Sequence, residues 1–494
     1  MASTALPRSD RRAALSGWRG DALALALLAL LVAATRGIWL GDPVAEFDEQ
    51  LYSYIGWRMQ YGELPFVDWW DRKPFGLLAI FGVAHALLGP GPEAYQIVAA
   101  GFAMAAAWLT YYLARMLADR MAATIAAAIA VMLLAAYGSY SGQSEVFFAP
   151  LMLGMVRLLA VPDHPRFARN AAMAMLLGGL ALQVKYTVLP QCLFLGLYAL
   201  WVQRRAGAST MQLGSLAALY ALLGLLPTIV IALYYAVLGH FDAYFFANFL
   251  SFFDRVAAPQ GRWVASHAPG VAPLAILVAG GIYAAFRMIR PGNFALWLLL
   301  LGWTGAALLS VLLPGTVYLY YYAALAAPCA LVAVPLFDRA GPAQATFGLL
   351  LVLACFSLLS LDGRRATSLA ERAAAQELAR AIAPHVDGRG NCLWLWDGPT
   401  ALYRMTGSCV PTRFVYPDHL NNALETPALG IDQTGEVARI LATRPAAIVT
   451  ANRAMTLQNR DAAALVKAAL ESSYEATTTA TMHNRELTVW LRRD

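Results

Sequence analysis

Charged residues are scarce in this sequence. Only 13% of its 494 residues are Asp, Glu, Lys or Arg, whereas 60% are hydrophobic, and the mean hydropathy is +0.55. So little charge cannot cover the surface of a soluble globular protein of this length. The composition therefore excludes that class and predicts an α-helical polytopic membrane protein.

Cysteine is scarce as well. The five cysteines include no CxxC pair and have no paired histidines beside them, which excludes the usual zinc-site patterns. Cys192, Cys329 and Cys355 fall in apolar runs and are expected to be small core residues. Cys392 and Cys409 lie 17 positions apart in mixed sequence. A disulfide in an oxidising compartment and two separate buried thiols are both open for this pair.

Long hydrophobic runs, by contrast, are abundant. About eleven segments of roughly 16 to 23 mostly apolar residues are long enough to cross a hydrocarbon core as helices. The first follows several arginines, but it is too long for a secretory signal and lacks a small-residue cleavage site, so we interpret it as an uncleaved span. The predicted spans are residues 22–40, 94–116, 121–137, 145–161, 168–184, 186–203, 213–238, 269–287, 293–313, 316–337 and 343–361.

Arginines in the short loops indicate the orientation, because Lys and Arg are retained on the cytoplasmic side. With the N-terminus in the cytoplasm, the Arg-containing loops after every second span face inward. Eleven spans then place the region after residue 361 in the periplasm, as in a multi-pass protein of a bacterial inner membrane. This pattern requires residues 75–88, between Pro74 and Pro90, to form an interfacial helix beside the outer surface.

The sequence changes character near residue 362, where apolar runs give way to mixed sequence. We predict two domains, a membrane domain over 1–361 and a small periplasmic α/β domain over 362–494. The scattered glycines of the second domain form no nucleotide-binding fingerprint, and no nucleic-acid partner is expected. Its predicted elements are helices over 364–383, 436–443 and 461–472 and strands over 391–396, 447–450 and 486–491.

Ionisable residues gather in one place, right after the first span. They occupy residues 47–50 (FDEQ), 62–65 (GELP) and 70–74 (WDRKP). We interpret this segment as a catalytic loop at the membrane surface. Asp48 could accept the proton of an attacking hydroxyl, while Arg72 and Lys73 suit a phosphate. The alternative is that Asp48 and Arg72 only neutralise each other in a folded loop.

The same segment resembles the first periplasmic loop of the GT-C membrane glycosyltransferases, in the branch with the protein O-mannosyltransferases and the lipid A aminoarabinose transferases. Many relatives there read Asp-Glu, then Gly-x-x-Pro-Tyr-x-Asp, then Lys-Pro-Pro. Here Phe66 replaces the Tyr and Phe75 replaces the second Pro. The resemblance extends along most of the membrane part, includes an interfacial helix after Lys-Pro, and reaches residues 402–414.

What the resemblance implies is transfer of a hexose or pentose from a polyprenyl-phosphate carrier to an acceptor hydroxyl, with inversion at the anomeric carbon. It makes Asp48 the base and makes Lys73, with Arg72, the holder of the phosphate; Glu49 is undecided between substrate binding and the scaffold. The acceptor stays open among lipid A or its core, a polysaccharide and a protein. No cofactor is expected. A subset of GT-C enzymes uses a divalent metal, for which Asp48, Glu49 and Glu145 are conceivable oxygen ligands, but we do not favour one.

Two further residues are candidates for substrate binding. Glu145 follows the third span in SGQSE and begins the next helix, where it either caps that helix or faces the site. Lys185 lies between the fifth and sixth spans, and its alternatives are snorkelling to the interface and contact with the phosphate. Because relatives carry Lys or Arg here, the resemblance favours phosphate contact for Lys185.

Aromatic residues are concentrated in two outer segments. Residues 240–267 contain eight aromatic side chains interleaved with Arg255 and Arg262, and form either an interfacial belt or a lid whose arginines add to phosphate binding. Tyr320 opens the tenth span, where many relatives have a His, and its alternatives are a cavity-facing hydroxyl and a belt aromatic.

Two rival functions remain. A polyprenyl-linked sugar transporter or flippase would also use many spans with a few buried charges, although the sequence shows no symmetric halves. A membrane-anchored glycan-binding protein would need fewer spans. The long charged loop and the exported domain favour the transferase.

Overall fold

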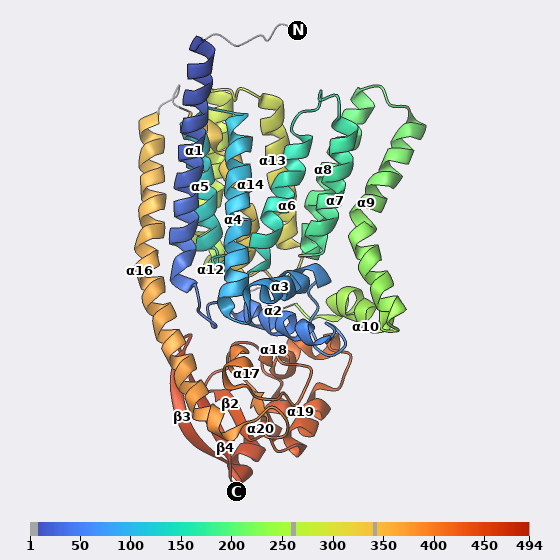
Figure 1. The fold of residues 1–494 in the computed structure, drawn as a ribbon, viewed down its shortest axis with the longest axis vertical. Coiled ribbons are helices and arrows are strands. Elements are labelled where there is room, and N and C mark those ends of the chain that lie inside the picture. The colour runs from blue at the N-terminus through green and yellow to red at the C-terminus, as the bar shows by residue number, and fades with distance from the viewer. Residues whose placement is uncertain (1–7, 258–262, 339–342, 494) are drawn as a thin grey trace.

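The computed structural model describes residues 8–257, 263–338 and 343–493. A bundle of long, roughly parallel helices stands on a layer of short helices that lie across its lower end, and a small α/β unit lies below that layer (Figure 1). The described part of the chain therefore has three levels, and the charged segment of the first loop lies in the middle one.

The bundle agrees with the predicted hydrophobic segments, since each of the eleven falls on a helix or a run of short helices. Among the described residues, five helices are long and apolar enough to cross a membrane by length and composition. Eleven spans therefore stay a prediction. The bundle helices are α1 (Arg8–Arg36), α4 (Pro92–Arg115), α5 (Arg120–Ala136), α6 (Ser144–Leu159), α7 (Phe167–Leu182), α8 (Leu189–Arg205), α9 (Thr210–Val237), α12 (Trp263–Arg287), α13 (Phe294–Leu312), α14 (Ala326–Val332), α15 (Val334–Phe337) and α16 (Ala343–Ile382).

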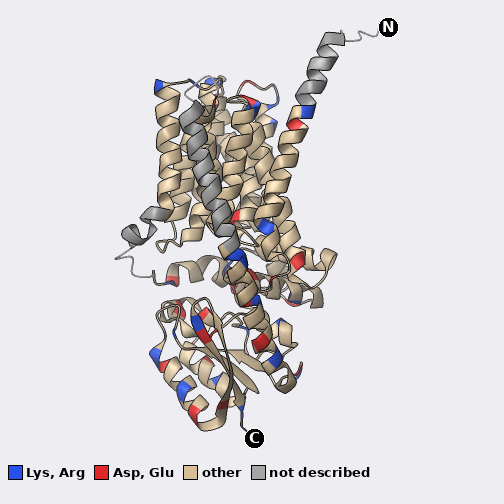
Figure 2. Ribbon diagram, turned by 90° about the vertical axis from the view of Figure 1, so that its left-hand side faces the viewer, with Lys and Arg blue, Asp and Glu red and all other residues tan. Residues whose placement is uncertain are grey.

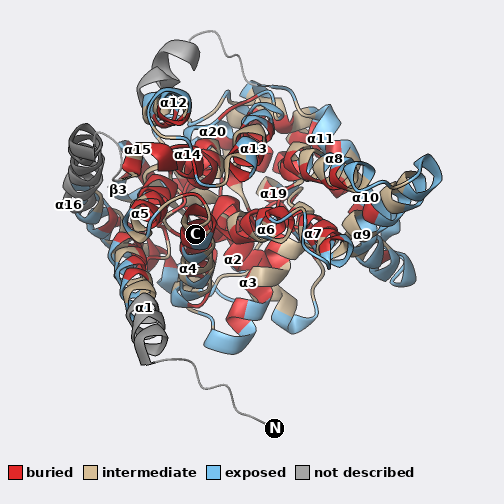
Figure 3. Cartoon of the chain, turned by 90° about the horizontal axis from the view of Figure 1, so that it is seen from above, coloured by how far each residue is buried: buried red, intermediate tan, exposed pale blue. Residues whose placement is uncertain are grey.

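Helix α9 lies apart at one edge of the bundle, with exposed residues along most of its length (Figure 3). It begins at a capping box formed by Ser209 and Gln212. Only 6% of its most apolar window is buried, although the mean hydropathy of that window is 2.4. A helix that is apolar and uncovered on most of its surface needs hydrocarbon around it. The fold thus supports a membrane setting independently of the composition.

The middle level is made of α2 (Phe47–Arg58) and α3 (Phe75–Leu88) from the first loop and of α10 (Phe241–Phe245) and α11 (Ser251–Asp254) from a later one. Helix α3 has the bounds predicted for the interfacial helix. Residues 47–50, placed by the sequence in the charged loop after the first span without an assigned secondary structure, form the start of α2. Glu46 caps this helix by accepting from the Asp48 amide at 3.4 Å, and the acidic first turn matches the helix dipole.

The C-terminal unit is a four-stranded sheet with order β1-β2-β4-β3. β1 and β2 are parallel, and the other pairs are antiparallel. Three strands and three helices were predicted, but β3 was missed because its TTTATM run lacks a clear apolar alternation. Lys, Arg, Asp and Glu are frequent in this unit and sparse in the bundle (Figure 2). The elements are β1 (Leu393–Leu395), α17 (Ala401–Thr406), α18 (Pro417–Asn421), η7 (Ala423–Ala428), α19 (Gln433–Ala442), β2 (Ala447–Ala451), α20 (Arg460–Ser473), β3 (Tyr474–Met482) and β4 (Arg485–Arg492).

Helix α16 joins the bundle to the C-terminal unit. It runs continuously through residue 362, where the domain boundary was predicted, and packs against β3. The predicted span over 343–361 and the predicted amphipathic helix over 364–383 are thus one helix. The boundary between two domains stays a prediction.

Cys392 and Cys409 form a disulfide, and this settles the choice that the sequence left open. It closes a loop around β1 and α17 with a sequence separation of 17. In the chain-entropy description, closing a loop of that length raises the free energy of the unfolded chain by about 3 kcal/mol.

Replacing both cysteines with serine should lower the free energy of unfolding of the C-terminal unit by about 3 kcal/mol. The measurement is thermal unfolding of the purified full chain in detergent, with and without a reducing agent. The reductant should shift the wild-type transition and leave that of the double variant in place. Equal shifts in the two proteins would contradict a stabilising disulfide.

Candidate active site

Asp48, in the first turn of α2, lies where the three levels meet. Its Oδ2 accepts from the Lys73 ammonium at 3.3 Å and from the Tyr52 hydroxyl at 3.1 Å. Tyr320, from the 3₁₀ segment Leu319–Leu325, approaches the same oxygen at 3.4 Å, and Tyr416 of the C-terminal unit approaches Oδ1 at 3.5 Å. The carboxylate is 20% exposed. Four segments remote in sequence therefore converge on one accessible carboxylate.

Lys73 is held by the turn that leads into α3. Its Nζ also donates to the Tyr52 hydroxyl at 2.5 Å, so that Tyr52 bridges Lys73 and Asp48. The turn is fixed from behind, where the Leu77 amide donates to the Gln183 carbonyl at 2.9 Å. Gly76 permits this approach, because a Cβ there would lie 2.7 Å from the Gln183 side chain. The turn with Lys73 is thereby seated against the connection that carries Lys185.

The charge state of this pair follows from its surroundings. Burial works to raise the pKa of the Asp48 carboxyl, but the Lys73 charge and the hydrogen bonds from Lys73 and Tyr52 outweigh it and hold the pKa below its usual value. Burial works in the same way to lower the pKa of Lys73, and the Asp48 and Asp71 charges outweigh it, so that this pKa is raised. At neutral pH the two groups form an ion pair.

Lys185 and Glu145 form a second ion pair, which closes the site on its membrane side. Both are buried, with Lys185 9% exposed and Glu145 1% exposed. The Lys185 ammonium also lies 4.1 Å from the centroid of the Tyr321 ring and 5.7 Å from that of Tyr320. Lys185 therefore turns inward to a partner and does not extend to the interface. Its contact with a phosphate stays a prediction, as does a substrate-binding role for Glu145.

Arg72 and Arg255 meet at Glu425, which lies in η7 of the C-terminal unit. Arg72 pairs with Glu425 Oε2, and Arg255 Nε donates to Oε1 at 2.8 Å. The alternative in which Arg72 neutralises Asp48 is wrong, because Asp48 pairs with Lys73. The two arginines were predicted to bind substrate, and the structure brings them together. Arg262, the other arginine of that segment, lies outside the described residues.

Glu49 lies behind Asp48, on the buried face of α2. Its carboxylate accepts from the Tyr95 hydroxyl at 3.1 Å and from the Gly142 amide at 2.5 Å, and the residue is fully buried. Burial raises the pKa of Glu49 to about 7. Burial, with the Asp48 charge added, raises that of Glu46 to about 8. Through these contacts Glu49 links α2 to the turn before α6. Its predicted substrate binding is untested.

Clustered metal ligands are absent from the part of the chain that the structure describes, in the sense that no three His, Cys, Asp or Glu side chains are grouped to hold an ion. Asp48, Glu49 and Glu145 each face a different partner, as described above. That the reaction needs no divalent ion stays a prediction.

Three residues at the site were missed by the sequence reasoning. Tyr52 lies four positions after Asp48, so that a helical interpretation of this segment would have placed both on one face. Tyr416 and Glu425 come more than 300 positions later in the C-terminal unit, Tyr416 just before α18 and Glu425 in η7. No local pattern connects them to Asp48 or Arg72, and only the tertiary fold reveals the contact.

Two sizeable cavities flank the site. An apolar one of about 300 Å³ lies among α6, α7, α8 and α9, and Leu182 and Leu189 at its end flank the connection with Lys185. A polar one of about 630 Å³ lies on the far side of Tyr320, lined by Trp39, Tyr140, Arg364 and Glu371 among others. The polar cavity thus reaches Tyr320 of the site, whereas the apolar cavity ends at the residues on either side of the connection that carries Lys185.

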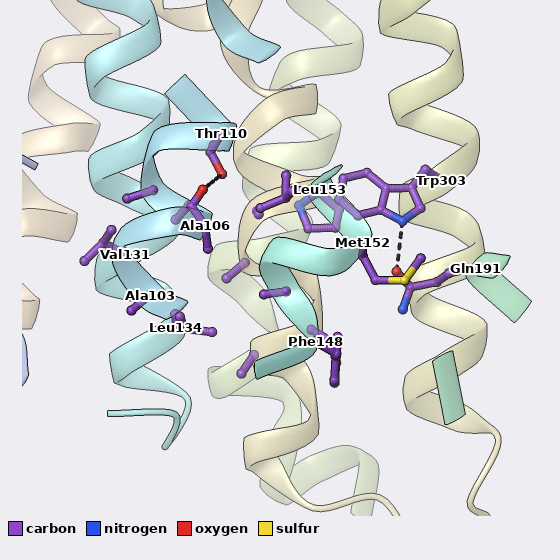
Figure 4. Close-up of a pocket in the computed structure, with 18 residues that line it drawn as sticks. Ala103, Ala106, Thr110, Val131, Leu134, Phe148, Met152, Leu153, Gln191 and Trp303 are labelled. Carbon is purple, nitrogen blue, oxygen red and sulfur yellow. Dashed lines mark hydrogen bonds between the residues drawn. The ribbon is translucent and has the colours of Figure 1, made fainter. Parts of the chain in front are cut away.

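A third cavity, inside the bundle, is not a candidate (Figure 4). It measures about 20 Å³, room for roughly one water molecule. Its polar groups are engaged, since Trp303 Nε1 donates to Gln191 Oε1 at 2.8 Å and the Thr110 hydroxyl donates to the Ala106 carbonyl at 2.8 Å. It is a packing void lined mostly by alanine and other apolar side chains.

Solved structures with the same architecture exist. ArnT from Cupriavidus metallidurans bound to undecaprenyl phosphate aligns with a TM-score of 0.60 at 16% identity, over 94% of this chain and 98% of that one. Its apo state gives 0.61 at 15% identity, over 96% and 98%. Archaeal oligosaccharyltransferase AglB from Archaeoglobus fulgidus, in complex with an inhibitory peptide and a dolichol-phosphate, gives 0.50 at 14% identity, over 87% and 69%.

This chain has the GT-C fold. ArnT and AglB are both GT-C glycosyltransferases, so the fold implied by the resemblance of the first loop is confirmed. No protein-family model matches the sequence, and no curated protein matches it. At 14–16% identity the likeness establishes the fold, and the chemistry must be argued from the site.

Glu49 should make stability depend on pH. A carboxyl whose pKa rises from 4.5 in the unfolded chain to about 7 in the fold holds its proton better when folded. The raised pKa stabilises the fold below pH 4.5, and this stabilisation is lost as the pH rises to about 7. The free energy of unfolding of the wild type should fall between pH 5 and 7.5. We expect Glu49→Gln to reduce that fall by an amount on the order of 2–3 kcal/mol.

Thermal unfolding of the full chain in detergent at several pH values measures this effect. The matched control is Glu471→Gln, whose carboxylate is 68% exposed and should leave the pH profile of the wild type unchanged. A profile for Glu49→Gln that stays parallel to the wild type would show that Glu49 is charged in the fold.

Proposed function

We propose that this protein is a glycosyltransferase that moves a sugar from a polyprenyl-phosphate carrier to an acceptor hydroxyl at the outer face of the membrane. One observation carries the proposal. A carboxylate, Asp48, and an ammonium, Lys73, meet beneath the helix bundle in a fold whose solved examples include ArnT with undecaprenyl phosphate and AglB with a dolichol-phosphate.

The chemistry needs a base on one side of the anomeric carbon and a cation on the other. The acceptor hydroxyl gives its proton to Asp48 as its oxygen attacks the anomeric carbon. The bond from that carbon to the phosphate oxygen breaks with its electron pair, and the charge left on the phosphate is stabilised by Lys73, with Arg72 and Lys185. Attack opposite to the leaving phosphate inverts the configuration, and no covalent sugar–enzyme intermediate is required.

Asp48 is suited to this role because its lowered pKa keeps the carboxylate ionised at neutral pH. Tyr52 and Lys73 hold one of its oxygens, which fixes its orientation towards the incoming hydroxyl. Donor binding separates Lys73 from Asp48 in part, since the phosphate competes for the same ammonium.

The two flanking cavities suit the two substrates. The apolar cavity of about 300 Å³ is matched to a polyprenyl chain, with its phosphate near Lys185. The polar cavity beside Tyr320 combines Arg364 and Glu371 with a stacked pair, Trp39 and Tyr140, whose ring centroids are 3.9 Å apart. Aromatic faces and charged hydrogen-bonding groups suit a hydroxylated acceptor, whether it belongs to a lipid, a glycan or a protein.

The proposed orientation has the N-terminus in the cytoplasm and the C-terminal unit in the periplasm of a bacterial inner membrane. The disulfide Cys392–Cys409 supports an oxidising compartment for that unit. The arginine distribution in the short loops supports the same orientation.

The proposal is tested by giving the purified protein a polyprenyl-phosphate sugar and an envelope extract as the source of acceptors. A transferase releases free polyprenyl phosphate and labels an acceptor. Movement of the intact donor between leaflets of a vesicle, with no release, would show a flippase and sink the proposal.

Asp48→Asn should retain folding and donor binding but lose sugar transfer by a factor of about 10² to 10⁴, because the amide keeps the shape and removes the base. Release of polyprenyl phosphate and binding of the donor are measured on the same preparation. Asp163→Asn, at an exposed position, is the matched control. Turnover near the wild-type level in Asp48→Asn would remove Asp48 from the mechanism.

Lys73→Ala should weaken donor binding and turnover together, each by about tenfold or more, because the ammonium contacts the phosphate before and during its departure. Binding is followed by titration and turnover by product release. Lys467→Ala serves as the control, since that side chain is 78% exposed. Loss of turnover with unchanged donor affinity would assign Lys73 to the departure step alone.

A further inference from the structure

Glu425 is placed where an anion would be expected, between two arginines proposed to hold the donor phosphate. Its carboxylate is 4% exposed. One oxygen pairs with Arg72 and the other accepts from Arg255 Nε at 2.8 Å. Arg72 precedes α3, Arg255 follows α11, and Glu425 comes from the C-terminal unit, so that three separate segments meet at one carboxylate.

The carboxylate has no further hydrogen-bond donor among the described residues, and the two arginines are the groups that hold it. Two guanidinium groups face this one carboxylate, and Asp71 and Asp418 lie within range of the same two charges. Burial favours the neutral acid, but the charges of Arg72 and Arg255 outweigh it and keep the pKa of Glu425 below its usual value. The group is a carboxylate at neutral pH.

Arg72 Nε, in the same guanidinium group that pairs with Glu425, is buried and has no hydrogen-bond partner among the described residues. A buried donor without a partner costs roughly 1–3 kcal/mol. A carboxylate offers two oxygens, and both are already used by Arg72 and Arg255. The donor phosphate, a diester of the polyprenyl chain and the sugar, likewise offers two non-bridging oxygens and one negative charge, so that it can take the place of the carboxylate between the two guanidinium groups.

We propose that Glu425 occupies the place of the donor phosphate in the unloaded protein. Its carboxylate holds Arg72 and Arg255 there, and it is displaced from between them when the phosphate binds. The proposal rests on the function proposed above. Glu425, from the C-terminal unit, then competes with the donor phosphate for Arg72 and Arg255. The stronger the displaced ion pair is, the lower is the apparent affinity for the donor.

The surroundings of Glu425 couple it to the segment that carries Arg255. The Val256 amide donates to the Leu424 carbonyl at 3.3 Å, and the Ser251 hydroxyl donates to the Ala428 carbonyl at 2.7 Å. The segment that carries Glu425 is thereby attached to the segment that carries Arg255. Exchange of the carboxylate for a phosphate therefore acts on the aromatic segment over 241–257 and on the C-terminal unit together.

The test is the affinity of the purified full chain for undecaprenyl phosphate, measured by titration in detergent. Glu425→Gln keeps the shape and removes the competing charge, and should bind about tenfold more tightly than the wild type, which corresponds to about 1.4 kcal/mol. Glu471→Gln, at an exposed glutamate, should bind as the wild type does. Unchanged or weaker binding by Glu425→Gln would show that Glu425 only positions the arginines, and would overturn the proposal.

Arg72→Ala in the Glu425→Gln background should abolish the gain, because the gain passes through that guanidinium. If the gain persists without Arg72, the proposed displacement of Glu425 is wrong. Should Glu425→Gln fail to fold, Glu425→Asp withdraws the charge by one methylene and should still bind more tightly than the wild type; weaker or equal binding by it counts against the proposal.

The outcomes separate this inference from the proposed function. A wild-type protein that does not bind undecaprenyl phosphate contradicts the donor site itself. A wild type that binds it, releases polyprenyl phosphate from the sugar-loaded donor and gains nothing from Glu425→Gln contradicts only the displacement of Glu425. Tighter binding of undecaprenyl phosphate but not of free inorganic phosphate would show that the lipid-borne phosphate, and not the free anion, displaces Glu425.

Discussion

Pairing of buried and partly buried charges at the junction of the bundle and the C-terminal unit is the constraint on which the rest of the structure depends. Asp48–Lys73, Glu145–Lys185 and Glu425 with its two arginines all lie there. Each pair joins segments far apart in sequence. An unpartnered charge in such surroundings costs about 3–5 kcal/mol, so the loops, the short helices and the sheet unit must arrive together.

The same charges account for the function that the site suits. In these pairs three carboxylates and four cations come together, which under the proposed function suits a phosphate. The apolar and the polar cavity lie on different sides of the site, so that under the proposed function the lipid donor and the hydroxylated acceptor would not share a path. Helix α3 packs on Gln183 at Gly76, and this contact sets the position of Arg72 and Lys73 relative to Lys185.

Much of this arrangement is readable from the sequence, for identifiable reasons. Apolar length predicts the bundle helices, and the prolines at 74 and 90 mark α3 because they interrupt an apolar run. Asp48 and Lys73 stand out because charge is so rare around them. Helix α2 was missed because its mixed composition looks like a loop, and β3 because its threonines do not alternate with apolar residues. Glu425 and Tyr416 could not be found, since their partners are set by tertiary packing alone.

Helix α9 has a consequence for how the protein meets its donor. It contacts α7 at Gly179, where a Cβ would lie only 2.4 Å from the Gly224 carbonyl oxygen, and most of its surface is not covered by protein. The apolar cavity behind it is thus walled on one side by a helix that lipid surrounds. Under the proposed function, the supply of donor is then governed by its surface density within the bilayer, measured per unit area, and not by any concentration in the surrounding water.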